Sequence, residues 1–109
     1  MNTNLRSEGE FDVLELEGEI DLHVSPQVRE QILASLKNGQ ALLIDMANVS
    51  YIDSSGIASL VEGFQTAKSS KLPYGLLSIS SPALQVLTLT RLDQVFSLYD
   101  DIAKFREQF

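Results

Sequence analysis

The stretch NVSYIDSSGI, residues 48–57, decides the fold of this chain because it joins an expected buried strand to an expected helix. The segment before it, residues 41–46 (ALLIDM), is short and mostly apolar, which is typical of a strand covered on both faces. Apolar residues then recur at spacings of three, four and seven: Ile57, Leu60, Val61 and Phe64. Asp53, Ser54 and Ser55 are suited to cap this helix, because short side-chain oxygens accept hydrogen bonds from its unpaired N–H groups. The stretch predicts a strand-to-helix turn carrying a hydroxyl that can be modified.

The segments before this turn predict a strand and a helix. Residues 1–10 are polar and suggest a frayed arm or an edge strand, whereas residues 11–17 alternate as a half-buried strand that Gly18 ends. Residues 19–22 form a short bridging segment. Ser25 followed by proline marks a helix start, and a glycine at position 39 marks its end. The expected core-facing residues of that helix are Val28, Ile32, Leu33 and Leu36.

The segments after the turn continue the alternation of strand and helix. A helix over residues 54–68 is followed by a buried strand over residues 74–79, and a second serine-proline pair at Ser81 starts another helix. Residues 92–99 suggest a short edge strand, and Asp100 or Asp101 then caps a last helix. This order predicts one α/β domain, residues 1–109, with helices packed on a mixed sheet.

The central helix carries a second stripe, made of small side chains. Ser55, Ser59 and Gly63 follow one another at intervals of four residues, with Ala58 beside them. A helix surface facing only solvent more often carries long charged side chains. Small residues let another backbone approach closely, so we expect a partner to approach here.

Composition and charge exclude several classes of function. The chain has 109 residues, 44% of them apolar and 21% charged, and no apolar run approaches the ~20 residues of a membrane span. Eight basic residues against fifteen acidic ones give a net charge of −7, which disfavours nucleic acid and anionic lipid as partners. Residues 1–10 lack the apolar core of a secretory signal, and there is no cysteine. We therefore expect a cytoplasmic protein without membrane insertion.

The residues that enzymes use are scarce. His23 is the only histidine, and without cysteine no metal site or catalytic triad can be assembled around it. The sequence contains no glycine-rich phosphate-binding loop, and Glu19 and Asp21 are expected to be surface carboxylates. Ser54 lacks an evident base that would make it a nucleophile. The sequence therefore predicts no catalytic residue, metal or cofactor.

Five short motifs, in this order, resemble the landmarks of STAS domains, and among these the bacterial anti-sigma factor antagonists most closely. They are GEID (18–21), IDM (44–46), YIDSSGI (51–57), SPA (81–83) and LDQVF (92–96). The resemblance covers residues 5–105 and implies a four- or five-stranded sheet flanked by about four helices. In those antagonists the anti-sigma factor is itself a serine kinase, and it phosphorylates the first serine after the aspartate. That residue here is Ser54.

The resemblance implies a switch between two partners. The unmodified protein, a monomer or weak dimer, would bind the ATP-binding kinase and release a sigma factor. Phosphate on Ser54, which free N–H groups of the helix would meet, would block binding until a phosphoserine phosphatase removes it. The residues expected at the partner surface are Asp21, Asp53, Ser54, Ser55, Gly56, Ala58, Ser59, Glu62 and Gly63.

Two other functions remain open at this point. STAS domains also serve as small subunits of lipid-transporting ABC complexes, where they bind the ATPase subunit without a phosphorylation cycle. Members of that branch tend to depart from the double serine, so Ser54 and Ser55 favour the regulatory branch. An enzyme with a Ser54 nucleophile would have only His23 as a base.

Overall fold

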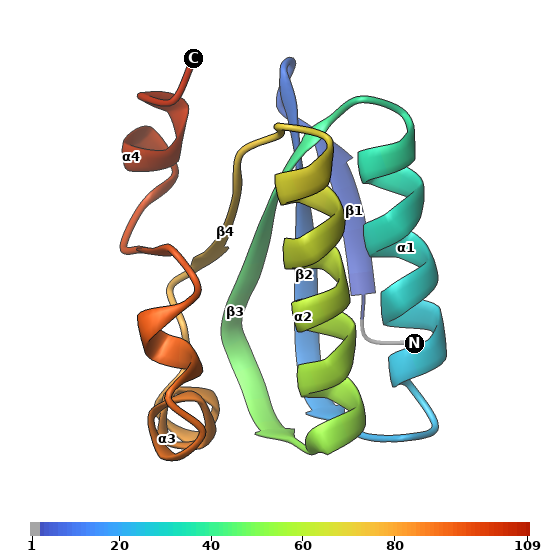
Figure 1. The fold of residues 1–109 in the computed structure, drawn as a ribbon. Helices are drawn as coiled ribbons and strands as arrows, with labels where there is room; N and C mark the ends of the chain where they lie inside the picture. The colour runs from blue at the N-terminus through green and yellow to red at the C-terminus, as the bar shows by residue number, and fades with distance from the viewer. Residues whose placement is uncertain (1–2) are drawn as a thin grey trace.

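Helices cover both faces of a five-stranded sheet in the computed structural model, which describes residues 3–109 (Figure 1). The strands are β1 (Thr3–Ser7), β2 (Phe11–Ile20), β3 (Ala41–Ile52), β4 (Tyr74–Leu77) and β5 (Leu98–Tyr99). The helices are α1 (Ser25–Lys37), α2 (Ser54–Ser69), α3 (Ser81–Leu89) and α4 (Ile102–Arg106), with a 3₁₀ turn, η1 (Leu92–Gln94). The strands lie side by side in chain order; β1 is antiparallel to β2 and the other pairs are parallel. The predicted mixed α/β architecture is confirmed.

Both edges of the sheet are formed by short strands. The N-terminal segment is the edge strand β1, one of the two alternatives that the sequence left open. At the other edge, β5 is two residues long: of residues 92–99, which suggested a short edge strand, the first three form η1 and only Leu98 and Tyr99 pair with β4. Within residues 3–109, no helix combines the length and apolar character that a membrane crossing requires.

Strands β2 and β3 are longer than their sequences predict. Gly18 was expected to end β2, but it adopts a left-handed φ of 79° at an irregularity of the ladder, and the strand continues to Ile20. Glycine tolerates this conformation, so the chain can pass through a bulge and resume pairing. Strand β3 continues beyond Met46, and its last residue Ile52 pairs with Ile20. Both strands therefore extend to the end of the sheet at which α2 begins.

The apolar side chains form two clusters, one on each face of the sheet. The larger cluster packs α1, α2 and α3 against one face and includes Leu14, Ile32, Ile44, Leu60 and Leu87. The smaller cluster packs α4 against the other face and includes Phe11, Val13, Leu43 and Phe105. The first half of β2 is thus buried on both faces. The prediction of a half-buried strand was wrong there because α4 covers Phe11 and Val13.

The two serine-proline pairs lie one position inside their helices. Ser25 is the buried first residue of α1, and the residue before it, Val24, makes no side-chain capping bond. Ser80, not Ser81, caps α3: its hydroxyl oxygen accepts from the N–H of Ala83 at 3.4 Å. The predicted helix starts at Ser25 and Ser81 are confirmed, but neither serine caps its helix. Asp101, one of the two candidates for α4, does cap that helix.

Candidate functional site at the Ser54 turn

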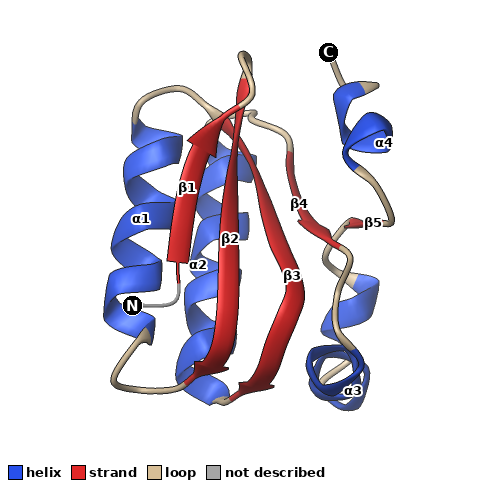
Figure 2. Ribbon diagram, turned by 180° about the vertical axis from the view of Figure 1, so that it is seen from behind, coloured by secondary structure: helices blue, strands red, loops and turns tan. Residues whose placement is uncertain are grey.

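The turn before α2 lies where strands β2 and β3 end together. Figure 2 shows their arrowheads side by side at the end of the sheet where α2 starts. The backbone N–H of Asp53 donates to the carbonyl of Ile20 at 3.2 Å, which joins the turn to the end of β2. Binding sites in sheets of this kind form at the carboxyl ends of parallel strands. The fold therefore places the turn where a site is expected.

Asp53 caps α2 through a single carboxylate oxygen. Oδ1 accepts hydrogen bonds from the N–H groups of Ser55 and Gly56, at 2.9 and 3.1 Å, and from the Ser55 hydroxyl at 2.6 Å. The hydrogen bond from the Ser55 hydroxyl does most to lower the pKa of Asp53. Partial burial raises this pKa, and the N–H groups of Gly56, Ser55 and Leu22 lower it further. The capping role predicted for this turn therefore belongs to Asp53.

This cap leaves few donors for a phosphate. The N–H groups of Ser55 and Gly56 are used by the Asp53 side chain, and the N–H of Ile57 donates to the Asp53 carbonyl at 3.0 Å. We expected free N–H groups at this helix end to meet a phosphate on Ser54. Among the first-turn N–H groups of α2, that of Ser54 makes no hydrogen bond within residues 3–109. The contact with a phosphate therefore stays a prediction, with fewer free donors than an uncapped helix end offers.

The two serines of the turn differ in accessibility. Ser54 is exposed, and among residues 3–109 no group accepts a hydrogen bond from its hydroxyl. Ser55 is half-buried and its hydroxyl donates to Asp53. Ser54 is thus the serine whose oxygen is free to react.

Gly56 holds the first turn of α2 against the sheet. A Cβ at this position would lie 2.7 Å from Cγ1 of Ile52 and 3.0 Å from the carbonyl oxygen of Ile20. Such contacts require a shift of the backbone or its neighbours. Gly56 is buried, so it shapes the site from inside and is not a contact surface.

The small stripe of α2 faces helix α1 of the same chain, which corrects the expected partner surface. The Ser59 hydroxyl donates to the Ser25 carbonyl at 3.3 Å, and a Cβ on Gly63 would lie 2.6 Å from Cγ2 of Ile32. Ser59 and Gly63 are both buried. The sequence correctly indicated a close approach, but the backbone that approaches belongs to α1. Ala58 alone, beside the stripe, remains exposed.

Glu62 is paired within the chain. Its two carboxylate oxygens accept from Nε and the Nη2 group of Arg29, both at 2.7 Å, and this pair links the outer surfaces of α1 and α2. The same bond raises the pKa of Arg29 and lowers that of Glu62. A role for Glu62 in partner binding stays a prediction.

Asp21 and Leu22, in the loop before α1, and Tyr51, near the end of β3, lie close to the turn along the chain. Asp21, half-exposed, accepts from the backbone N–H of His23 at 3.0 Å and shapes the loop. Leu22 and Tyr51 are exposed by 69% and 49% although both are large and apolar. Sequence reasoning missed these two residues, because it treated apolar side chains only as core. Their position next to Asp21 and Asp53 was the available signal.

Acidic and histidine residues do not converge elsewhere. Within residues 3–109, no three His, Asp or Glu side chains form a group that could hold a metal ion.

Replacing Asp53 by asparagine should lower the melting temperature by several degrees at neutral pH, because the helix loses an ionised cap. The folded-state pKa of Asp53 is lowered, so its stabilisation is present above the usual aspartate pKa of about 4 and is lost as the pH falls through the folded value. Thermal unfolding of wild type and Asp53→Asn from pH 7 to pH 2 should show converging curves. Curves that stay parallel would contradict a role for the ionised carboxylate.

Known proteins that are similar to this chain belong to one family. A family model described as STAS domain matches residues 2–105. The anti-sigma-B factor antagonist of Bacillus subtilis is 28% identical over 100 residues, covering 90% of this chain and 92% of that protein. An anti-sigma factor antagonist from Mycobacterium paratuberculosis has the same fold, with a TM-score of 0.86 at 23% identity over 98% of this chain and 92% of that one.

A further solved structure is that of the anti-sigma factor antagonist SpoIIAA in its unphosphorylated form. It superposes with a TM-score of 0.83 at 18% identity, covering 97% of this chain and 94% of that one. At this identity the likeness speaks for the fold. The family model covers nearly all of the chain. The chain therefore belongs to the STAS domain family.

Proposed function

We propose that this chain is an anti-sigma factor antagonist controlled by phosphorylation of Ser54. Unmodified, it binds an anti-sigma factor that is also a serine kinase, and the bound sigma factor is released. Phosphorylated, it no longer binds, until a phosphoserine phosphatase restores it. The chain is then a cytoplasmic regulatory binding protein and the substrate of a kinase, without catalytic activity of its own.

The observation that carries this proposal is the contrast between the two serines. The Ser54 hydroxyl is exposed on a rigid turn, whereas Ser55 is engaged with Asp53 at 2.6 Å. The names of the relatives support the proposed role as an antagonist of an anti-sigma factor, since the Bacillus subtilis protein is an anti-sigma-B factor antagonist. Phosphorylation is a property of SpoIIAA, which has been described in unphosphorylated and phosphorylated forms.

The proposed modification is a simple transfer. A bond forms between Ser54 Oγ and the γ-phosphorus of ATP, while the bond from that phosphorus to the bridging oxygen breaks and ADP leaves. The hydroxyl proton passes to a base of the kinase. The chain supplies only an accessible hydroxyl held at a fixed position, and the charge added at neutral pH is about −1.5 to −2.

Intact-mass measurement tests the assignment. Wild type incubated with ATP and each purified candidate anti-sigma factor kinase should gain one phosphate with its cognate kinase, and Ser54→Ala should gain none. Ser55→Ala is the matched control and should still be phosphorylated. Phosphate on Ser54→Ala, or none on Ser55→Ala, would contradict the choice of Ser54. Binding to an ABC ATPase subunit without any phosphorylation would favour the transporter role instead.

A further inference from the structure

Helix α3 exposes an uncharged surface in a chain that is otherwise strongly acidic. Residues 72–90 contain no charged side chain, although 21% of the chain is charged and its net charge is −7. Burial explains this for strand β4, all of whose residues are buried. It does not explain it for α3, because only Ala83 and Leu87 of its nine residues are buried. A helix that meets only solvent more often carries long charged side chains, so α3 has the composition of a contact surface.

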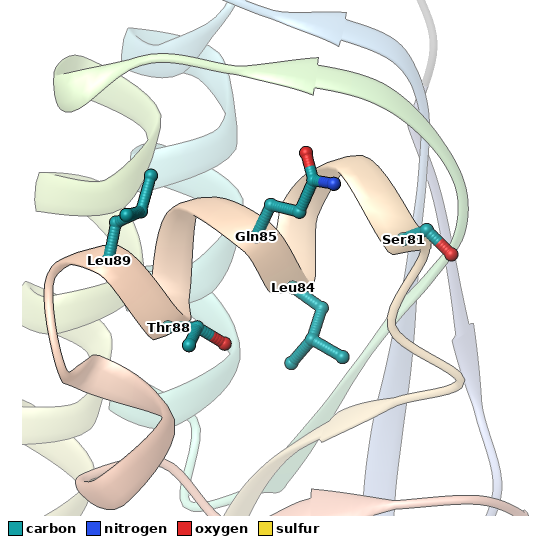
Figure 3. A pocket seen from close by; sticks show the side chains of 5 residues that line it. All are labelled: Ser81, Leu84, Gln85, Thr88 and Leu89. Carbon is teal, nitrogen blue, oxygen red and sulfur yellow. The ribbon is translucent and has the colours of Figure 1, made fainter.

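Five side chains of α3 line a shallow groove, and we call this surface the α3 face. Figure 3 shows its members: Ser81, Leu84, Gln85, Thr88 and Leu89. They recur at intervals of three and four residues, so they share one side of the helix. All five are exposed, and the exposed fractions of Leu84 and Leu89 are 38% and 85%. The α3 face is therefore open and uncharged, with two large apolar side chains.

The turn after α3 places two opposite charges beside this face. A second groove shares Thr88 and Leu89 with the first and is lined further by Arg91, Asp93 and Gln94. The N–H of Arg91 donates to the Thr88 carbonyl at 3.1 Å, and the N–H of Gln94 donates to the Arg91 carbonyl at 3.2 Å, which fixes the backbone of the turn. Arg91 is exposed and Asp93 is half-buried, and within residues 3–109 neither makes an ion pair. Both charges are therefore free to pair with another molecule.

Arg91 carries its charge at a backbone position that favours glycine. Its φ is 61°, in the left-handed region, and it directly follows Thr90, the C-cap of α3. Glycine is the usual residue at this place because it adopts a left-handed φ without strain. No ion pair within the part of the chain that the structure describes accounts for an arginine here, whereas an acidic group on another molecule would.

We propose that the α3 face is the contact between two copies of this chain, related by a two-fold axis that passes near Leu89. Such a contact brings the same surface of both copies together, so that surface must be complementary to itself. The α3 face meets this condition, because its leucines face those of the second copy while Arg91 of each copy pairs with Asp93 of the other. Each copy has a net charge of −7, but α3 carries no like charge that would oppose the approach.

Sedimentation velocity at protein concentrations from about 10 μM to about 1 mM tests the contact. Because one short helix and one turn form it, the dimer should be weak, with a Kd on the order of 100 μM. Leu84→Ser and Leu89→Ser should each raise this Kd about tenfold, because each loses the burial of a leucine side chain. Leu22→Ser is the matched control: Leu22 is 69% exposed in the loop before α1, and its replacement should leave the Kd unchanged.

Exchange of the two charges tests the reciprocal ion pairs. Arg91→Asp sets two aspartates against each other across the contact, and Asp93→Arg sets two arginines against each other. Each variant alone should therefore raise the Kd by a factor of about five to ten at low salt. An equimolar mixture of the two variants should form a heterodimer with about the affinity of wild type, because each pair then joins an aspartate to an arginine. An effect confined to one chain cannot produce this recovery.

Glycine at position 91 separates the charge from the fold. Arg91→Gly suits the left-handed backbone, so its melting temperature should equal or exceed that of wild type, while its dimer should be weaker. Wild type that stays monomeric up to about 1 mM would overturn the proposal. A mixture of the two charge variants that associates no better than either variant alone would also overturn it, as would a dimer that Leu89→Ser leaves unchanged.

Discussion

Valine in place of Gly63 should destabilise the chain by about 3 kcal/mol or more, a large part of the 5–15 kcal/mol that stabilises a typical domain. A Cβ here would lie 2.5 Å from the Tyr74 hydroxyl and 2.6 Å from Cγ2 of Ile32. The Tyr74 hydroxyl donates to the Leu60 carbonyl at 2.8 Å, and burial raises the pKa of Tyr74 above its usual range, so it remains a donor. Valine would therefore both overpack the α1–α2 contact and leave a buried hydroxyl without its acceptor.

Urea unfolding followed by circular dichroism measures this effect. Ala58→Val is the matched control on the same helix: Ala58 is exposed, so only the lower helix propensity of valine should act, about 0.5 kcal/mol. The comparison also separates two roles of the small stripe. If Gly63 were a partner contact, Gly63→Val would fold normally and lose binding, which would contradict the packing of α2 against α1.

Local pattern was enough to predict the helices, and it could not predict what packs against them. The spacing of Ile57 and Leu60 gave the buried face of α2 because that spacing depends only on the helix. Gly63 signalled a close approach, but whether the approaching backbone belongs to α1 or to another protein depends on tertiary structure. The bulge at Gly18 is similar: glycine permits the left-handed conformation, and only pairing with β3 shows that the strand continues.

The site was predictable in part for the same reason. Asp53 and Ser54 follow a buried strand, and this order places them at the carboxyl edge of the sheet before any coordinates are known. The contrast between Ser54 and Ser55 required the hydrogen bond from Ser55 to Asp53. Leu22 was missed because an apolar residue in sequence suggests the core, and its exposure follows from the path of the loop before α1.

Aspartate in place of Ser54 should weaken binding to the anti-sigma factor kinase by a factor of about a hundred or more. The reason is that an uncompensated charge in a buried contact is unfavourable by about 3–5 kcal/mol. Two of the N–H groups that could compensate it, those of Ser55 and Gly56, already donate to Asp53 at 2.9 and 3.1 Å. The folded state should be little affected, because Ser54 is exposed and a carboxylate is favourable in the first turn of a helix.

Two neutral variants separate charge from size in this experiment. Ser54→Asn has nearly the volume of aspartate without its charge, and it should retain most of the affinity; Ser54→Ala should bind like wild type but resist phosphorylation. Calorimetric titration of the kinase with each of the three variants gives the order of their affinities. The melting temperature of each variant is measured to check that it is folded. If Ser54→Asp bound as tightly as wild type, the proposal that phosphorylation of Ser54 switches binding off would be wrong. Equal losses for aspartate and asparagine would mean that bulk, not charge, is what the partner excludes at the turn.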